Sequence, residues 1–340
     1  MPSRIPEAQN SPVQSINISS QPPGKDPVWD KAPALIPFPL LKRFAGHNLW
    51  LSLWLVSGAS FLLPHGTFAL PRPVCRFQVT KQKIYPGSLF LVSAHCAEPV
   101  SKATATFRQK QFIFFAGKNQ MVSYAFVGAD LESRPGSYPL EVELELGGSR
   151  KQEWKESVRI FPKQFPVQKI TVAEKYAKPD PADQQRAEAE AKKLEALWKV
   201  NSAGRYWDTP FELPVKSELT SGFGRRRVVN GESRSPHSGV DLKADVGAPI
   251  RATNKGKVVV AEEMFFSGNT IVIDHGLGLY TFYGHCSKIL VRVEETVNSG
   301  QVIGEVGATG RVTGPHLHWA CRLNETRVNP LDLLSLVMAD

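Results

Sequence analysis

The stretch "NTIVIDHGLGLYTFYGHC", from Asn269 to Cys286, predicts the fold class of the C-terminal part of this 340-residue chain. Two runs rich in Ile, Val, Tyr and Phe stand on either side of the turn "GLG", and such residues favour strands while closely spaced glycines favour a tight turn. Further runs, "KILVRVEETV" and "QVIGEVGA", follow with the turns "NSG" and "GATG". Residues 208–340 are therefore predicted to form a mostly antiparallel β domain built from hairpins.

A second β-rich region occupies residues 74–162. Six or seven short runs, separated by Gly, Pro and Asn, include "SLFLVSAHC", "KATATFR", "QFIFFAG", "MVSYAFVGA", "YPLEVELEL" and "ESVRIFP". Many short strands at close spacing are typical of an immunoglobulin-like β-sandwich. The whole chain is thus predicted to be mainly β, and nothing in this first β domain resembles a catalytic motif.

A linker with one helix is predicted between the two β domains, over residues 163–207. In "DPADQQRAEAEAKKLEALWKV", Asp180 is suited to cap the helix and Pro181 to occupy its first turn. The apolar residues on one stripe of this helix are Ala187, Ala191, Leu194 and Trp198. The helix is expected to dock against a domain or to act as a spacer.

The N-terminal region predicts export. Residues 1–43 are rich in Ser, Pro, Gln and Asn and are expected to be a disordered tail. Residues 44–71 contain no Asp, Glu, Lys or Arg, and "LWLSLWLVSGASFLL" forms their apolar centre. That length suits a signal peptide, although an uncleaved membrane anchor remains open. The expected location is the periplasm or cell envelope, either free or anchored in the inner membrane.

The net charge of +9 and the isoelectric point near 9.3 favour acidic partners. Nucleic acid, an anionic lipid surface and an anionic cell-wall polymer all fit a basic protein. No block of Lys and Arg interleaved with aromatic residues occurs, nor a helix-turn-helix or zinc-finger spacing. We therefore expect no nucleic-acid partner.

Three short histidine motifs lie in the C-terminal domain: "HSGVD" from His237 to Asp241, "YGH" ending at His285, and "HLH" from His316 to His318. Residues separated by an even number project from one face of an extended segment. His237 and Asp241 can therefore face the same way, as can the two histidines of "HLH". A lone histidine is more often structural, but this number of ligand-type side chains favours a site.

The chemistry of these residues suits zinc. A catalytic zinc site uses three protein ligands and keeps its fourth position for water. His237, Asp241 and His318 would be the ligands, and two imidazoles with one carboxylate leave a net positive charge that acidifies the water. His285 and His316 then remain as acid, base or oxyanion partners.

Three segments carry a resemblance to a known family. "SGFGRRRVVNGESRSPHSGVDLKADVGAPIRA", "YTFYGH" and "GATGRVTGPHLHW" resemble the lysostaphin/LytM-type zinc metallopeptidases, which cut peptide cross-links in bacterial peptidoglycan. The resemblance covers roughly residues 208–334 and implies a mostly antiparallel β catalytic domain. The segment "FPKQFPVQKITV" also resembles members that carry an N-terminal immunoglobulin-like domain.

The resemblance implies a role for each site residue. His237, Asp241 and His318 would bind one zinc ion per chain, and His285 and His316 would be catalytic. The implied substrates are the stem peptides and cross-links of peptidoglycan. Cys286 stands where relatives usually have an aliphatic residue, and it is expected to face away from the metal. Which cross-link is cut, and whether the enzyme is an endopeptidase or a carboxypeptidase, stay open.

Two rival functions are compatible with parts of the pattern. A non-catalytic LytM-like regulator of a cell-wall amidase would share the fold but would have lost metal ligands, whereas all three stand here. A cupin-like metal enzyme also uses His-x-His, but its remaining histidine should follow that motif. No histidine follows His318 in this chain.

Four cysteines occur, at positions 75, 96, 286 and 321. An exported chain permits disulfides, so a Cys75–Cys96 bridge and a Cys286–Cys321 bridge behind the active site are both predicted. Small buried thiols are the alternative for each pair.

Overall fold

The computed structural model describes residues 74–81, 83–147, 150–336 and 338. The described residues fall in one compact unit, Phe68–Asp340, and are mainly β, as predicted. Strand pairing among them is antiparallel except between β9 (Val167–Ile170) and β11 (Arg226–Val229). The predicted tail (1–43) and signal or anchor segment (44–71) lie outside the described residues. Within the described part of the chain, no helix has the length and apolar character needed to cross a membrane.

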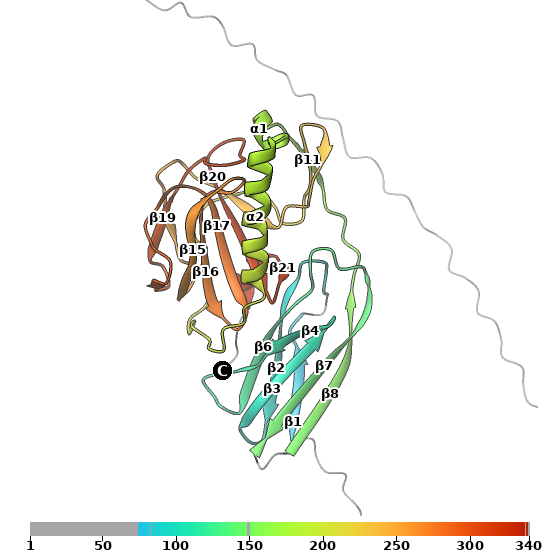
Figure 1. Ribbon diagram of the computed structural model, residues 1–340. Helices are drawn as coiled ribbons and strands as arrows, with labels where there is room; N and C mark the ends of the chain where they lie inside the picture. The colour runs from blue at the N-terminus through green and yellow to red at the C-terminus, as the bar shows by residue number, and fades with distance from the viewer. Residues whose placement is uncertain (1–73, 82, 148–149, 337, 339–340) are drawn as a thin grey trace, which may run out of the picture. The chain divides into compact units, whose positions relative to one another are not determined.

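Two four-stranded sheets make up the N-terminal β domain (Figure 1). The first sheet has the strand order β1 (Cys75–Val79), β2 (Leu89–Cys96), β6 (Val122–Gly128) and β5 (Phe115–Ala116). The second has the order β4 (Lys110–Ile113), β3 (Val100–Phe107), β7 (Gly136–Leu146) and β8 (Arg150–Ile160). Apolar residues alternate with glutamates along β7, so one face of that strand is buried. Phe90 and Phe107, from different sheets, meet edge to face at 5.7 Å in the shared core. The immunoglobulin-like assignment of this two-sheet domain, and the boundaries 74–162, stay predictions.

The four cysteines divide into one bridge and two thiols. Cys75 and Cys96 face each other across β1 and β2 and form the predicted disulfide. The predicted Cys286–Cys321 bridge is wrong, because both cysteines are free and buried. Cys321 pairs with Thr281, five residues before Cys286 on the same strand, which at the usual rise of a strand is roughly 16 Å away. Disulfides need Cα atoms within about 7 Å, so the strand register excludes this bridge.

The linker contains the predicted helix and two elements that were not predicted. Helix α2 (Pro181–Trp198) begins where expected, and the Asp180 side chain accepts a hydrogen bond from the Asp183 N–H at 2.8 Å. Strand β9 and the short helix α1 (Glu174–Ala177) precede it. Trp198 packs with Val260, Met264, Val272 and Tyr280. Helix α2 therefore docks on the C-terminal sheet, along which it lies in Figure 1.

A ten-stranded sheet dominates the C-terminal domain. Its main order is β10 (Leu219–Ser221), β13 (Gly239–Lys243), β20 (His316–Leu323), β17 (Leu279–Ile289), β16 (Gly268–Gly276), β15 (Gly256–Met264) and β18 (Thr296–Val297). Strand β19 (Val302–Val306) pairs with β17 and with β14 (Pro249–Arg251), and β21 (Thr326–Val328) pairs with β20. A separate sheet joins β12 (Glu232–Ser233), β11 and β9, and the 3₁₀ helix η2 (Pro330–Ser335) follows β21.

Strand β16 contains the run "IVI" (271–273), in which three consecutive residues are apolar instead of alternating with polar ones. Its Val272 packs in the cluster of Trp198, whereas Ile271 and Ile273 belong to the main core on the other face. A strand covered on both faces needs apolar residues at consecutive positions. The helix thus accounts for the unbroken run "IVI".

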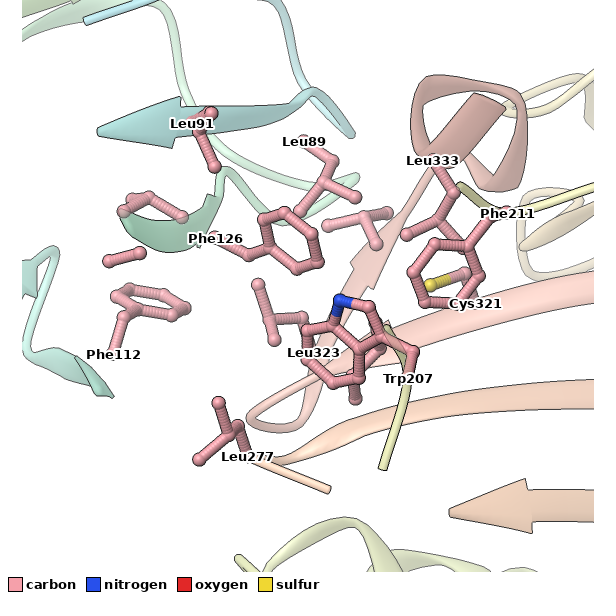
Figure 2. Close-up of a cluster of buried hydrophobic side chains, with 14 of the residues drawn as sticks. Leu89, Leu91, Phe112, Phe126, Trp207, Phe211, Leu277, Cys321, Leu323 and Leu333 are labelled. Atoms are coloured by element: carbon pink, nitrogen blue, oxygen red, sulfur yellow. The ribbon is translucent and has the colours of Figure 1, made fainter. Parts of the chain in front are cut away.

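One hydrophobic cluster contains residues of both β domains, and Figure 2 shows Phe126, Trp207 and Leu323 within it. The rings of Phe126 and Trp207 are stacked with centroids 5.4 Å apart. Beside this cluster, Arg327 makes an ion pair with Asp130 at 2.6 Å. These contacts connect the N-terminal β domain to Trp207 and to strands β20 and β21 of the C-terminal domain.

His275 in β16 is expected to make the protein less stable in mild acid. Burial lowers its pKa from 6.5 to about 4, and its Nδ1–H donates to the Lys255 carbonyl at 2.8 Å. Between these two pKa values the unfolded chain binds a proton that the folded chain does not. The free energy of unfolding should therefore fall as pH drops from 6.5 toward 4, by about 3 kcal/mol for this group.

Urea unfolding at neutral pH and at about pH 5, in the presence of a chelator, measures this dependence. His275→Gln should lower stability at neutral pH but show a smaller loss on acidification than the parent. The exposed His95 provides the control, since His95→Gln should retain the parent's pH dependence. An identical pH dependence in His275→Gln and the parent would contradict the prediction.

Candidate metal and catalytic site

Three side chains from two adjacent strands converge on one point. His237 stands just before β13, Asp241 lies within β13, and His318 lies in β20 directly opposite Asp241 in the strand register. His237 Nε2, Asp241 Oδ1 and His318 Nδ1 lie 2.9 Å from one another. They form a group of His and Asp ligand atoms within the described residues that could hold a metal ion.

Gly239 allows this close approach. A Cβ at this position would lie 2.5 Å from the Trp319 carbonyl oxygen and 2.8 Å from His318 Cε1. Both distances are shorter than real Cβ contacts, so any side chain here would push β13 away from β20. The glycine in "HSGVD" is thus a packing requirement of the site.

The hydrogen on the His237 ring is on Nδ1, so Nε2 directs a lone pair toward Asp241 and His318. This Nδ1 lies 3.1 Å from the Gly222 carbonyl oxygen, which can only accept, so Nδ1 carries the hydrogen and Nε2 does not. Burial lowers the pKa of His237 to about 4, which keeps the ring neutral at pH 7. A neutral imidazole is the form that binds metals.

Asp241 supplies the negative charge. Burial by itself would raise the pKa of this carboxyl group, but its close contacts with the rings of His237 and His318 outweigh that effect and hold the pKa well below its usual range. A carboxylate with two imidazoles is a common donor set for catalytic zinc. The residues present therefore fit a divalent metal bound through three protein atoms.

Arg227 in β11 holds the second oxygen of the carboxylate. Its Nη2 lies 3.1 Å from Asp241 Oδ2, while Oδ1 faces the two histidines. Partners of this kind fix the orientation of a metal ligand. Sequence reasoning missed Arg227; the run of three arginines at 225–227, close before His237, was the signal that could have found it.

A chain of hydrogen bonds connects His237 to the linker. The Ser221 hydroxyl lies 3.3 Å from His237 Nδ1 and donates to Gln168 Oε1 at 2.9 Å. Ser221 therefore accepts from His237 Nδ1–H, alongside the Gly222 carbonyl. Gln168 belongs to β9, far from the motifs in sequence, and nothing in its local sequence marks it as part of a site.

Removing Gln168, the last residue in this series of hydrogen bonds, should weaken metal binding. Gln168→Leu leaves the Ser221 hydroxyl free to rotate and donate elsewhere, so the His237 ring is held less firmly. Loss of such an outer partner typically weakens metal affinity by about 10-fold or more. Competitive chelator titration measures this affinity, and Gln184→Leu on helix α2 is the matched control. Equal affinities for all three proteins would show that Gln168 does not support the site.

His285 and His316 stand beside the three ligand-type residues. Their ring centroids are 4.9 Å apart, and His316 Nε2 lies 3.7 Å from Asp241 Oδ1. Each Nδ1–H donates to a backbone carbonyl at 2.8 Å, of Thr309 for His285 and of Gly314 for His316. Both rings therefore keep Nε2 available for proton transfer.

The backbone at His285 departs from regular strand geometry. Gly284 pairs with His318 and shares its face, so simple alternation would turn His285 to the opposite face. Its φ of 67° breaks the alternation, and the ring centroid lies 6.0 Å from that of His318. A non-glycine residue with positive φ is uncommon and is often found at functional sites.

The environment of His285 also favours its neutral form. Burial lowers the pKa of His285 to about 3, and the nearby His318 and His316 act in the same direction. The ring is therefore neutral at pH 7, with the lone pair of Nε2 unprotonated. All five residues singled out from the sequence lie together, and their individual roles stay predictions.

Comparison with known proteins places this site within a named family. The model of "Peptidase family M23" matches residues 235–330, which include all five residues. The peptidoglycan DD-endopeptidase ShyB of Vibrio cholerae is 44% identical over 104 residues, or 30% of this chain and 24% of that protein. The DD-carboxypeptidase/endopeptidase Mpg of Neisseria meningitidis is 38% identical over 119 residues, or 35% of this chain and 27% of that protein. The matched segments thus span about a quarter of these curated relatives.

A solved structure extends the similarity beyond the catalytic segment. A Pseudomonas aeruginosa protein described by its family, peptidase M23, is 31% identical with a TM-score of 0.58. The alignment covers 74% of this chain and 95% of that one. Since this relative is matched over nearly its whole length and the family model covers the site, the chain belongs to peptidase family M23.

Proposed function

We propose that this protein is a zinc-dependent metalloendopeptidase that hydrolyses peptide cross-links of bacterial peptidoglycan. The observation that carries the proposal is that the five site residues form two groups, three suited to bind a metal and two suited to transfer protons. His237, Asp241 and His318 direct their ligand atoms to one point. His285 and His316 donate from Nδ1–H to backbone carbonyls and keep Nε2 available beside them. The similarity to ShyB, which is named as a peptidoglycan DD-endopeptidase, supports the substrate class.

His237, Asp241 and His318 would hold the zinc ion. When bound there, zinc supplies a Lewis acid that polarises a peptide carbonyl and lowers the pKa of water. His285 and His316 would act in proton transfer. The unprotonated Nε2 of one ring accepts a proton from the attacking water, and the resulting N–H then donates to the oxyanion or to the leaving amine. Arg227 keeps Asp241 oriented throughout.

The main rival remains a non-catalytic regulator of a cell-wall amidase. Such a protein needs neither an open metal position nor two spare histidines. Two histidines whose Nδ1–H groups donate to backbone carbonyls, and whose Nε2 atoms lie beside the three ligand-type residues, are groups that a reaction can use and that a regulator does not need.

Export to the cell envelope is part of the proposal. The apolar segment at 44–71 motivates it, and the Cys75–Cys96 disulfide supports it, since disulfides persist mainly in oxidising compartments. Peptidoglycan lies in the same compartment as an exported enzyme.

Digestion of purified peptidoglycan sacculi tests the function. The zinc-loaded protein should release un-cross-linked muropeptides, identified by mass spectrometry. A chelator should stop the reaction and added zinc should restore it. Release of terminal D-alanine with cross-links left intact would change the assignment to a carboxypeptidase. If sacculi stay unaltered but a purified amidase is stimulated, the regulator is the correct function.

A further inference from the structure

Three arginines belong to segments that adjoin the residues of the candidate metal and catalytic site. Arg227 lies in β11, Arg234 follows β12, and Arg311 lies in the loop between β19 and β20. The backbone N–H of Arg234 donates to the Arg227 carbonyl at 2.9 Å, so these two residues are neighbours. Arg227 contacts Asp241 directly and therefore borders the site.

The loop of Arg311 is part of the catalytic architecture. Thr309, two residues earlier, provides the carbonyl that accepts from His285. The Arg311 N–H donates to the Phe266 carbonyl at 2.8 Å, and its guanidinium carbon lies 4.4 Å from the centroid of the Phe266 ring. Stacking on a ring holds the guanidinium plane and leaves its N–H edges able to donate.

Arg311 differs from the other two arginines in its partners. Arg227 is paired with Asp241 and Arg234 with Glu232. Among the described residues, no carboxylate forms an ion pair with Arg311. Burial and the two neighbouring positive charges lower the pKa of Arg311 to about 10. A partly buried cation next to like charges is unfavourable unless an anion compensates it.

We infer that Arg311 forms a subsite that binds a free carboxylate of the peptide substrate, beside the bond to be cut. This inference rests on the proposed function, because it takes the substrate to be a peptide of the cell wall. The planar guanidinium is suited to bind a carboxylate through two parallel hydrogen bonds. The carboxylate is either the C-terminal one of the leaving peptide or a side-chain one close to the bond.

Binding of matched peptides tests the subsite. Three synthetic cross-linked stem peptides are compared: one with free carboxylates, one with the C-terminal carboxylate amidated, and one with the side-chain carboxylate amidated. Dissociation constants are measured with full-length His316→Ala, in which hydrolysis is suppressed, with and without Arg311→Gln. One of the two amidations should weaken binding by about tenfold or more when Arg311 is present. In Arg311→Gln, that same amidation should have little effect.

A charge-matched control and the use of binding as the readout separate a specific role of Arg311 from a general charge effect and from failure of the proposed function. Arg76→Gln changes the net charge equally at an exposed position in β1 and should retain the full amidation effect. The inference is overturned if amidation weakens binding equally with and without Arg311, or if neither amidation matters. Because binding is measured rather than hydrolysis, a parent protein that cleaves no cross-link would refute the proposed function while the Arg311 comparison still decides the subsite.

Discussion

Asp241→Ala is expected to remove bound zinc and to abolish hydrolysis, the largest effect predicted for any single substitution here. Asp241 Oδ1 lies 2.9 Å from the ligand atoms of both His237 and His318, so its loss removes a third of the donor set. It also removes the only negative charge among the three ligands. Two neutral imidazoles alone bind a divalent ion far more weakly than a three-ligand site does. His318→Ala should have the same consequence.

Zinc content by mass spectrometry and turnover of a cross-linked peptide measure this effect in parallel. Asp245→Ala, an exposed aspartate only four residues away, is the matched control and should keep about one zinc per chain. The parent and this control should cleave the peptide equally. One zinc per chain in both Asp241→Ala and His318→Ala would show that the metal site is wrongly assigned.

His316→Ala is expected to keep the metal and lose the reaction. The His316 ring lies near His285, with its Nε2 3.7 Å from Asp241 Oδ1, whereas the three ligand atoms are 2.9 Å apart. A fourth protein ligand would close the position that water needs. General acid–base catalysis contributes about 10²–10⁴ in rate, so turnover should fall at least about a hundredfold with the fold intact. His285→Ala should behave in the same way.

The two readouts separate the roles of the histidines in "HLH". His318→Ala should lose zinc and activity together, but His316→Ala should lose activity alone. His95→Ala, in the N-terminal domain, controls for the removal of an exposed histidine. Should His316→Ala lack zinc, or retain zinc with full activity, the division of labour between these residues is incorrect.

The sequence by itself determined the features that depend on local chemistry. Period-two alternation required His316 and His318 to share one face, and glycine-rich turns between apolar runs required antiparallel hairpins. The cap at Asp180 and the proline after it marked the start of helix α2 to the residue. Each of these signals acts within a few residues along the chain, so it can be read without knowledge of the fold.

Tertiary structure alone decided the features that depend on register and on contacts between distant segments. The Cys286–Cys321 bridge was predicted from alternation, but strand pairing places Thr281 opposite Cys321 and so separates the two thiols. The positive φ of His285 turns its ring to the face of His318, against the alternation that the sequence suggests. Gln168 and Arg227 reach the site only because β9 and β11 pair beside it. Register and non-local pairing arise from the packing of the whole domain, which sums many weak contacts that no short stretch of sequence contains.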